Sequence, residues 1–492
     1  MEKTYKGATG EQYSRLVIRN VTLINGLGTP AEGPVDILIE GDTITDINRG
    51  DPVALGKRGP DWKQLEGDHV IDATGMYVIP GLVDMHAHPP VNTDTCGPRG
   101  TEYVYKLWLA HGVTTLRTCG WSGYETLFEH RRLGEENKMV VPHLVVLQGW
   151  PCEESYTPEE AREQVRKYKE LGADGIKFRG RGTHLHPDMI ESMCDEVKKV
   201  GMRAGVATHI GVSHIDAAIM SNAGVQTIEH WYGIPQAAIP GTQHFPPGYN
   251  EMDELDRFRW AGHLWKEADQ YPEEVVKVLD LLIKNSTIWD TTLVVYEANR
   301  DLGRAKTLEF HDRYTMPSLM EYWSPAPGHH ASYHFDWKTS DEIAWKENFR
   351  IWMKYLKMFF ERGGIITVGT DAGSLYAPYG FSTIRELELL QEVGIHPIDI
   401  IKMATTNAAK ALGLKNLAGG VRKGVTADLA IVNGNPLDNF KVMYGAGLEK
   451  FSEDQTKKVL GGGVKWTIKG GVVFDAQALL RDVEDYVREM KG

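Results

Sequence analysis

The chain lacks the features of an exported or membrane-bound protein. It has only four cysteines, no two of them close in the sequence: Cys96, Cys119, Cys152 and Cys194. This spacing fits free thiols in a reducing compartment better than a disulfide framework. The segment from Met1 to Glu11 contains no apolar core of a signal peptide, and no apolar run reaches the roughly 18 residues that a transmembrane helix needs. We therefore expect a soluble, cytoplasmic protein with no membrane partner.

Positive charge is also scarce. The chain has 54 Lys and Arg against 67 Asp and Glu, which gives a formal net charge of −13 at pH 7. No basic cluster of the kind that binds phosphate backbones occurs in it. Nucleic acid is therefore not an expected partner, and a small-molecule substrate is.

What the chain does contain is a set of histidines and an aspartate at the ends of apolar runs. The run that begins at Val78 ends in His86 and His88, whose side chains point to the same side of a strand because they are two residues apart. Three further runs end in His209, His230 and Asp371. In a (β/α)8 barrel, the C-terminal ends of the strands meet at the active-site face. A histidine pair alone could be two ordinary polar residues, but the whole set predicts a metal site.

Lys177 lies in the strand-like run Gly175-Ile-Lys-Phe178, between the two groups of histidines. A bare ammonium group there would be repelled by bound metal ions. An amine that has captured carbon dioxide becomes a carbamate, whose two oxygens can bridge two cations. We interpret Lys177 as an N6-carboxylated ligand of a two-metal hydrolase. For this residue alone, a salt bridge at the barrel mouth is the alternative.

The spacing of these residues fits the repeat of a barrel, since one βα unit takes about 30 residues. About three repeats separate His88 from Lys177, and about one repeat separates each of the next two pairs, up to His230. The stretch from His230 to Asp371 holds about two repeats and a large surplus. This pattern predicts ligands on strands 1, 4, 5, 6 and 8.

The chain is longer than a barrel of about 250 residues, so further elements are expected. Residues 13–80 and 425–475 alternate in strand fashion and are expected to form one small β-sandwich domain. An N-terminal extension over 1–12 precedes it, the barrel occupies 81–424, and a helix is expected over 476–492. The predicted fold class is α/β: a (β/α)8 TIM barrel with a small β-sandwich built from both chain ends.

Insertions around residues 231–285 and 300–350 account for the remaining length. Eight of the 13 tryptophans lie between Trp231 and Trp352. Aromatic insertions over a barrel mouth can form a lid that excludes water and recognises a flat or apolar group. Packing of the insertions themselves, or an oligomer interface, is an equal alternative. Trp231 and Tyr232, directly after a ligand, are the better candidates for substrate contact.

Two further residues are candidates for substrate binding. Arg179 is two residues beyond Lys177, where a guanidinium could hold a substrate carboxylate with two hydrogen bonds; a surface salt bridge is the alternative. Tyr296 follows an apolar run that is the predicted seventh strand, and its hydroxyl could stabilise an oxyanion. A buried structural tyrosine is the alternative there.

Six short segments are specific in combination, and they read Pro80-Gly-Leu-Val-Asp-Met-His-Ala-His88, Gly112-Val-Thr-Thr-Leu-Arg117, Gly172-Ala-Asp-Gly-Ile-Lys177, Thr227-Ile-Glu-His230, Gly369-Thr-Asp-Ala-Gly373 and Ala404-Thr-Thr-Asn-Ala-Ala409. Through them, most of the chain resembles the amidohydrolase superfamily. Within it, the chain is similar to the binuclear-metal branch that includes Xaa-Pro dipeptidases and imidazolonepropionase-related proteins.

The resemblance implies a role for each ligand. His86, His88 and Asp371 would hold the more buried metal, His209 and His230 the more exposed one, and carboxylated Lys177 would bridge both. A hydroxide between the two metals would attack a carbonyl, and Asp371, the catalytic residue, would pass the proton to the leaving nitrogen. This donor set suits Zn²⁺ best, with manganese, cobalt and iron left open. The family also leads us to expect a homo-oligomer.

The chain departs from the dipeptidase pattern in two places that shape the substrate pocket. The predicted third strand, from Leu144, lacks a following loop with Gly and His, and His230 is followed by the bulky Trp231. The predicted function is hydrolysis of an amide C–N bond in a small molecule such as a dipeptide, an N-acyl amino acid or a xenobiotic amide. A cyclic-amide hydrolase, a deaminase or a metal-dependent decarboxylase on the same fold is the alternative, and a non-catalytic scaffold is the third.

Overall fold

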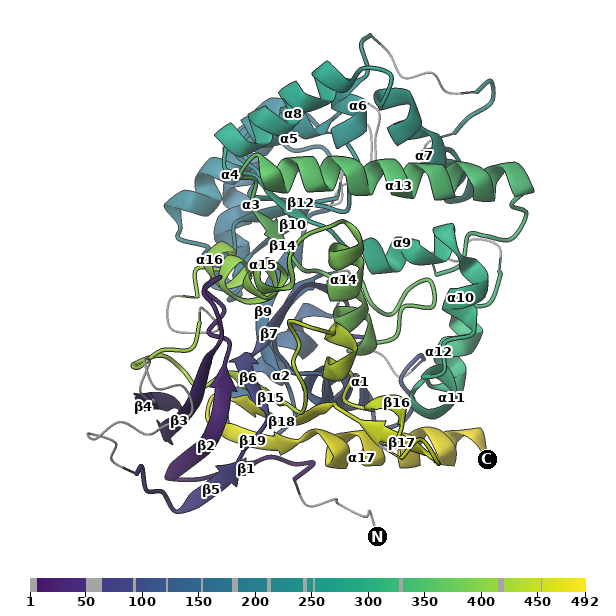
Figure 1. Ribbon diagram of the computed structural model, residues 1–492. Helices are drawn as coiled ribbons and strands as arrows, with labels where there is room; N and C mark the ends of the chain where they lie inside the picture. Colours follow the sequence, from purple (N-terminus) through teal and green to yellow (C-terminus); the bar gives the residue numbers. More distant parts are fainter. Residues whose placement is uncertain are drawn as a thin grey trace.

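The computed structural model describes residues 7–49, 64–91, 94–120, 123–151, 154–178, 185–209, 214–241, 246–250, 253–326, 331–414, 420–452 and 454–492. Figure 1 shows helices around a central barrel, with strands from the two ends of the chain, in purple and yellow, below it. No helix in these ranges combines the length and the apolarity needed to cross a membrane.

The centre of the fold is an eight-stranded parallel sheet whose strands follow one another in chain order. Its two ends meet, because Met85 N donates to Val368 O at 2.8 Å and Ala87 bridges to Ala372 in parallel. The predicted TIM barrel is thus confirmed. The strands are β7 (Leu82–Ala87), β8 (Val113–Cys119), β9 (His143–Gly149), β10 (Gly175–Phe178), β11 (Val206–Thr208), β12 (Thr227–Glu229), β13 (Ile288–Asp290) and β14 (Ile366–Thr367).

Helices cover the outside of the barrel, and α3 shows why the sequence forms them. Its N-cap Thr157 and Glu160 form a reciprocal capping box, with Pro158 in the first turn. Ala161, Val165 and Tyr168 are buried, as the apolar stripe of a helix that packs on a sheet should be. The helices around the barrel are α1 (Glu102–Ala110), α2 (Tyr124–Glu135), α3 (Pro158–Glu170), α4 (Pro187–Lys199), α5 (Ala217–Asn222), α8 (Pro272–Lys284), α13 (Thr339–Glu361), α14 (Phe381–Glu392), α15 (Pro397–Lys402) and α16 (Ala408–Ala411), with a π-helical turn over Met403–Asn407.

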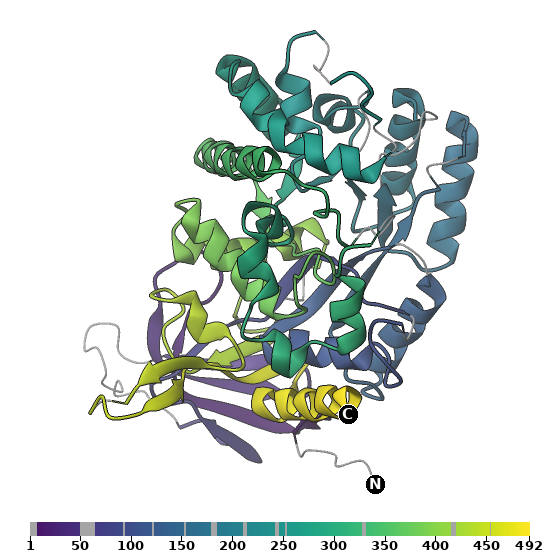
Figure 2. The ribbon, with the colours of Figure 1, turned by 90° about the vertical axis from the view of Figure 1, so that its right-hand side faces the viewer.

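The two ends of the chain form one nine-stranded mixed sheet beside the barrel (Figure 2). The ends meet where β6 pairs antiparallel with β15, with Val78 opposite Ile431. This sheet has an aliphatic core of its own, which includes Ile18, Ile37 and Leu429. Its strands are β1 (Glu11–Gln12), β2 (Arg15–Leu23), β3 (Glu32–Glu40), β4 (Thr43–Arg49), β5 (His69–Asp72), β6 (Tyr77–Pro80), β15 (Leu429–Val432), β18 (Val464–Lys469) and β19 (Val472–Asp475).

The remaining C-terminal elements pack around this sheet. A 3₁₀ turn over Phe440–Met443 precedes the hairpin of β16 (Leu448–Phe451) and β17 (Lys458–Gly461), and the described chain ends with helix α17 (Ala476–Lys491). Asp475 caps α17 by accepting a hydrogen bond from Ala478 N at 2.9 Å.

The insertions are helical, and most of their tryptophans are core residues. Six of the eight tryptophans from Trp231 to Trp352 are completely buried. Helices α7 and α13 are joined by Trp345 Nε1, which donates to Phe258 O at 2.9 Å. Packing within the insertion therefore accounts for most of its aromatic content. The insertion helices are α6 (Ile234–Ala238), α7 (Glu254–Ala268), α9 (Leu293–Arg300), α10 (Leu302–Lys306), α11 (His311–Tyr314) and α12 (Pro317–Tyr322).

Candidate metal centre

The six predicted ligands lie at the C-terminal ends of five barrel strands. His86 is in β7 with His88 just beyond it, and Lys177 is in β10. His209 directly follows β11, His230 directly follows β12, and Asp371 follows β14. These are the first, fourth, fifth, sixth and eighth strands of the barrel. The structure therefore brings all six side chains to one mouth, where they line a single cavity.

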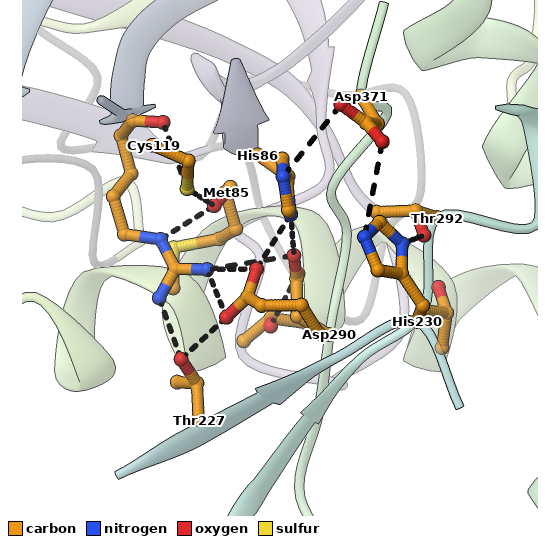
Figure 3. A network of polar contacts seen from close by, with 12 residues as sticks. Met85, His86, Cys119, Thr227, His230, Asp290, Thr292 and Asp371 are labelled. Atoms are coloured by element: carbon orange, nitrogen blue, oxygen red, sulfur yellow. Dashed lines mark hydrogen bonds and ion pairs between the residues drawn. The ribbon is translucent and has the colours of Figure 1, made fainter. Parts of the chain in front are cut away.

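Asp371 is at the centre of the imidazole groups. Its Oδ1 lies 3.1 Å from His88 Nε2 and 3.7 Å from His86 Nε2, and its Oδ2 lies 3.8 Å from His230 Nε2. Figure 3 shows Asp371 facing both His86 and His230. The ring centroids of His209 and His230 are 4.6 Å apart. Four imidazoles and a carboxylate thus surround one small volume.

The electrostatics of this group favour an ionised carboxylate at Asp371 and neutral imidazoles at His88 and His230. At His86, burial would lower the pKa, but Cys119, Asp371 and Glu229 raise it to about 10. Burial lowers the pKa of His88 to about 4, against the opposing effect of Asp371. Burial alone would raise the pKa of Asp371, but His86, His88 and His230 hold it far below its usual range. At neutral pH, His88 is therefore an uncharged nitrogen donor and Asp371 an oxygen donor, the states in which both ligate metals.

Lys177 is a buried amine without a hydrogen-bond partner among the described residues. Its side chain is 3% exposed, and its Nζ lies 3.6 Å from the closest carboxylate oxygen, Glu229 Oε2, beyond hydrogen-bond distance. Glu229 thus offers a charge partner at 3.6 Å but no hydrogen bond, and a buried ammonium without a hydrogen bond is costly.

A buried ion network behind the metal ligands escaped the sequence analysis. Arg117, from β8, donates to both Glu229 oxygens at 2.8 Å, and Glu229 Oε2 lies 2.6 Å from His86 Nδ1. Burial would raise the pKa of Glu229, but Arg117 and then Lys177 hold it well below its usual value. An ionised Glu229 fixes His86 with its Nδ1 protonated, which leaves Nε2 free to ligate. The only sequence signal for this network was a charged residue inside an otherwise apolar run.

The seventh strand supports His230 in a similar way. Thr292, just beyond β13, has its Oγ1 2.5 Å from His230 Nδ1. Next to it, Glu386 of α14 accepts hydrogen bonds from Leu293 N at 2.9 Å and Val294 N at 2.7 Å, at the first turn of α9. Glu386 thus holds the segment that carries Thr292.

Three residues of the centre have left-handed backbone conformations, which are rare outside glycine. The φ angles are +61° at His230, +48° at Thr292 and +54° at Asp371. Such conformations persist only where the surrounding structure enforces them, and they cluster at functional sites.

Two of the four residues predicted to contact substrate do not line the cavity of the ligands as far as the structure describes them. Arg179 lies outside the described residues. Trp231 is completely buried against Trp265, Trp345 and Trp352 and does not line the cavity of the ligands.

The two tyrosines lie closer to the ligands. Tyr232 stacks on His209, with centroids 5.2 Å apart. Tyr296 lines the cavity, with its ring 5.3 Å from that of His230. The expectation that Tyr296 follows the seventh strand along an apolar strand run was wrong: β13 ends at Asp290, and Leu293-Val-Val begins helix α9. Short apolar runs have no periodicity that separates a strand from a buried helix.

Comparison with known proteins agrees with this geometry. A model of the Amidohydrolase family matches residues 353–473. The crystal structure of a Xaa-Pro dipeptidase with methionine in its active site superposes with a TM-score of 0.62 and 20% identity, over 94% of this chain and 100% of that one. A bottromycin amidohydrolase gives a TM-score of 0.66 at 17% identity, over 99% of this chain and 92% of the other.

The family model thus covers about a quarter of the chain, and the superposed structures show that the chain has their fold. A curated sequence match, to a dihydroorotase of Thermoanaerobacter sp. (strain X514), is 42% identical over 74 residues but spans only 15% of this chain and 14% of that protein. The comparisons therefore show the fold of the chain and a similarity of residues 353–473 to the Amidohydrolase family.

The donor set at the barrel mouth fits divalent cations. His86, His230 and Asp371 place one potential ligand atom each within 4.8 Å of one another. Nitrogen and oxygen donors of this kind suit zinc and other first-row metals. The amine of Lys177, beside this group, has no hydrogen-bond partner among the described residues, and a carbamate would explain this feature.

Proposed function

We propose that this chain is a binuclear metal-dependent hydrolase that cleaves an amide C–N bond of a small molecule, such as a dipeptide, an N-acyl amino acid or a xenobiotic amide. The observation that carries the proposal is the convergence of four imidazoles, Asp371 and the buried amine of Lys177 on one cavity at the barrel mouth. In a fold whose active sites lie at this face, such a set has no comparable structural purpose.

Carboxylation of Lys177 is the part of the proposal that the local chemistry supports most directly. As an ammonium, Lys177 Nζ has no hydrogen-bond partner among the described residues and lies among imidazoles that would have to hold cations. As a carbamate it carries a negative charge and two oxygens, enough to ligate two metals. We assign His86, His88 and Asp371 to one metal, His209 and His230 to the other, and N6-carboxylated Lys177 to both, with Zn²⁺ as the preferred ion.

Divalent cations held there would supply a water whose pKa falls from about 15.7 to about 7, together with a polarised substrate carbonyl. The chain's own residues would do the rest. Asp371, whose pKa is held far below its usual range by the three histidines around it, would accept a proton as the water oxygen bonds to the carbonyl carbon. It would then pass this proton to the nitrogen as the C–N bond breaks, which releases a carboxylic acid and an amine.

The support of the ligands by other side chains completes the proposal. Glu229 orients His86, and Thr292 orients His230, each through the Nδ1 atom. Substitution of a residue that hydrogen-bonds to a metal ligand commonly lowers metal affinity or activity 10- to 100-fold.

The first experiment is metal content per chain by plasma emission spectroscopy, on protein purified without chelator, together with amine release from a panel of N-acyl amino acids, dipeptides and aryl amides. Two metals per chain with amine release are expected. One metal or none would contradict the binuclear centre, and ammonia or carbon dioxide as the product would move the assignment to a deaminase or a decarboxylase.

Lys177→Ala tests the bridging role. This variant should lose at least one metal and most of its activity, and short carboxylic acids that fill the gap should restore part of both. The matched control is Lys199→Ala, since Lys199 lies on the surface of α4 with a side chain that is 60% exposed. Full metal content and undiminished turnover in Lys177→Ala would contradict the carbamate.

A further inference from the structure

A cavity of about 360 Å³ lies beside the metal centre and is lined by other residues. It is enclosed by α9, α10 and α14, which Figure 1 shows next to one another, and by the segment from the 3₁₀ turn to the start of β16. We call it the side pocket. Its volume falls in the range that holds small organic ligands. Among the described residues that line it, none is a proposed metal ligand.

Ring side chains form much of the wall of the side pocket. Phe310 stacks on Phe381 with centroids 4.3 Å apart, and the ring of Tyr444 lies 5.0 Å from that of Phe310. Tyr376 lines the pocket as well, and the ammonium group of Lys306 lies over its ring at 5.5 Å. A flat ring is the kind of ligand group that such walls bury well.

The charged groups in the wall are paired with one another. Arg385 of α14 donates to both oxygens of Glu297, at 2.6 and 3.0 Å, and to Glu388 at 2.6 Å. Arg304 donates to Glu297 at 2.8 Å. A charged ligand group would thus lose its water beside side chains whose charges are already neutralised, which favours an uncharged ligand. The remaining charged residues of the lining are exposed and opposite in sign: Glu309 and Lys441.

Ser382 offers a hydrogen-bonding group that this network does not use. It lies in the first turn of α14, is 1% exposed and lines the side pocket. Its Oγ has no hydrogen-bond partner among the described residues. A buried hydroxyl without a partner is costly, and a ligand that pairs with it removes this cost.

The side pocket shares a wall with the cavity of the metal ligands, because Leu375 lines both. Leu375 and Tyr376 have φ angles of +51° and +60°, left-handed conformations that persist only where the surroundings enforce them. Both lie in the loop after β14 that carries Asp371. A ligand that packs on Leu375 and Tyr376 therefore acts on the loop that positions Asp371.

Helices α9 and α14 connect the side pocket to a second metal ligand. Val294 lines the pocket, and its backbone N donates to Glu386 of α14 at 2.7 Å. This contact holds the segment of Thr292, whose Oγ1 lies against His230 Nδ1. The pocket is thus built from the elements that support Asp371 and His230.

We propose that the side pocket is an effector site, which binds a ring compound with one uncharged hydrogen-bonding group and thereby stabilises the ligand arrangement of the metal centre. The ring packs on Phe310, Phe381 and Tyr376, and the polar group pairs with Ser382 Oγ. A ligand that binds this conformation favours it over others, so affinity for metal rises when the pocket is occupied. The effect on metal rests on the proposed function, whereas the binding of the ring compound does not.

Titration with 2-naphthol tests the ligand class. This compound is a flat ring system whose hydroxyl, like that of other phenols, is uncharged at neutral pH. Isothermal titration calorimetry on the protein as purified should show 2-naphthol binding at least about tenfold more tightly than 2-naphthoate, which carries a carboxylate in place of the hydroxyl. Equal or tighter binding of 2-naphthoate would overturn the preference for an uncharged group.

Ser382→Ala tests the polar contact. It should weaken 2-naphthol binding by about three- to tenfold, the usual contribution of one hydrogen bond. The matched control is Ser324→Ala, since Ser324 is exposed beyond α12 and its Oγ donates to Met320 O at 3.1 Å. An unchanged affinity in Ser382→Ala would remove Ser382 from the site.

Leu308→Trp tests the location, because Leu308 is half-buried in the lining and a larger ring there fills the side pocket. Binding of 2-naphthol should weaken at least about tenfold, whereas Leu171→Trp, at a position 62% exposed at the end of α3, should leave it unchanged. A crystal structure of the wild type with 2-naphthol covers the case in which Leu308→Trp fails to fold. The compound should lie between α10 and α14, and binding at the metal ligands alone, or no binding, would overturn the side pocket.

Competition with a chelator measures the coupling to the metal centre. The affinity for Zn²⁺ should be at least about fivefold higher with saturating 2-naphthol than without it, and removal of metal should weaken 2-naphthol binding by the same factor. Unchanged affinities would overturn the coupling. A protein that binds no metal would contradict the proposed function and the coupling together, while the titrations with 2-naphthol would still decide whether the side pocket is a binding site.

Discussion

The two sides of the metal centre are built from opposite kinds of sequence. The side toward β10–β13 is packed with an aromatic insertion in which most tryptophans are completely buried. The side toward β7, β8 and the loop after β14 is formed by loops with few aromatic residues, yet it contains the larger cavity. Abundant aromatic residues thus indicate a well-packed wall here, whereas the larger cavity lies where prolines and small residues leave volume unfilled.

This contrast assigns different consequences to substitutions on the two sides. Changes on the side toward β10–β13 should alter stability and the geometry of the ligands, because its aromatic side chains are densely packed. Changes around the larger cavity should alter which compounds bind. Asp371 belongs to both sides, so its replacement should have the largest effect.

Asp371→Asn should lower turnover by about 10²- to 10⁴-fold, because the amide cannot carry the proton from water to the leaving nitrogen. Much of the metal should remain, since the other five ligands are intact. Steady-state rates and metal content measured together check this, with Asp312→Asn as control at a side chain 91% exposed. Wild-type rates in Asp371→Asn would remove this residue from the mechanism.

Phe258→Ala should destabilise the fold by about 3–5 kcal/mol, because it leaves a cavity beside a stacked ring. Leu127→Ala on the side toward β7 and β8 should cost less, near 2 kcal/mol at the low end of that rule, since one face of Leu127 already borders the larger cavity. Urea unfolding of both variants gives the comparison. Equal losses of unfolding free energy in the two variants would contradict the distinction between a densely packed side and a side with a larger cavity.

His334, in the same aromatic region, should make stability depend on pH. Burial and then Lys306 lower its pKa to about 3, so the unfolded chain, with a His pKa near 6.5, binds more protons below pH 6.5. The stability that neutral His334 contributes is present above pH 6.5 and is lost as pH falls toward 3. Between pH 7 and 4 the wild type should lose about 2–3 kcal/mol more than His334→Gln, as measured by urea unfolding at each pH. Parallel pH profiles would contradict this.

Thr292→Val should weaken metal binding by about 10- to 100-fold, since Thr292 Oγ1 is the partner of His230 Nδ1. The loss should fall on one metal of the pair. Competition with a chelator gives the affinity. The control is Thr307→Val at an exposed turn, because the hydroxyl of Thr307 donates to Gly303 O of α10. Unchanged affinity would mean that the backbone alone orients His230.

Some of the centre could be predicted because it depends on local order in the chain. The sequence directly shows the alternation that places His86 and His88 on one side of a strand. It also shows the βα repeat that separates Lys177, His209 and His230. The barrel and the pairing of the two chain ends followed from the same periodicities. The role of these residues as metal ligands stays a prediction until metal is measured.

Other parts depend on packing and had no local signal. Tyr296 was expected beside a strand and lies in a helix, because three apolar residues have no distinct period. Trp231 follows a ligand directly but turns into a cluster of tryptophans. Arg117 and Glu229 form an ion pair between strands that are more than 100 positions apart in the sequence. Neither segment contains a pattern that predicts this pairing.

The sequence by itself determined the fold class, the strand that carries each proposed ligand and the chemistry of the donor atoms, since all three follow from side-chain type and short-range periodicity. The tertiary structure alone decided which side of the centre is densely packed and which contains the larger cavity. That cavity, of about 480 Å³, is lined by Pro89, Leu127, Tyr322 and Tyr379, residues far apart in the chain. Unfilled volume is a property of how such distant segments pack, and no single segment contains it.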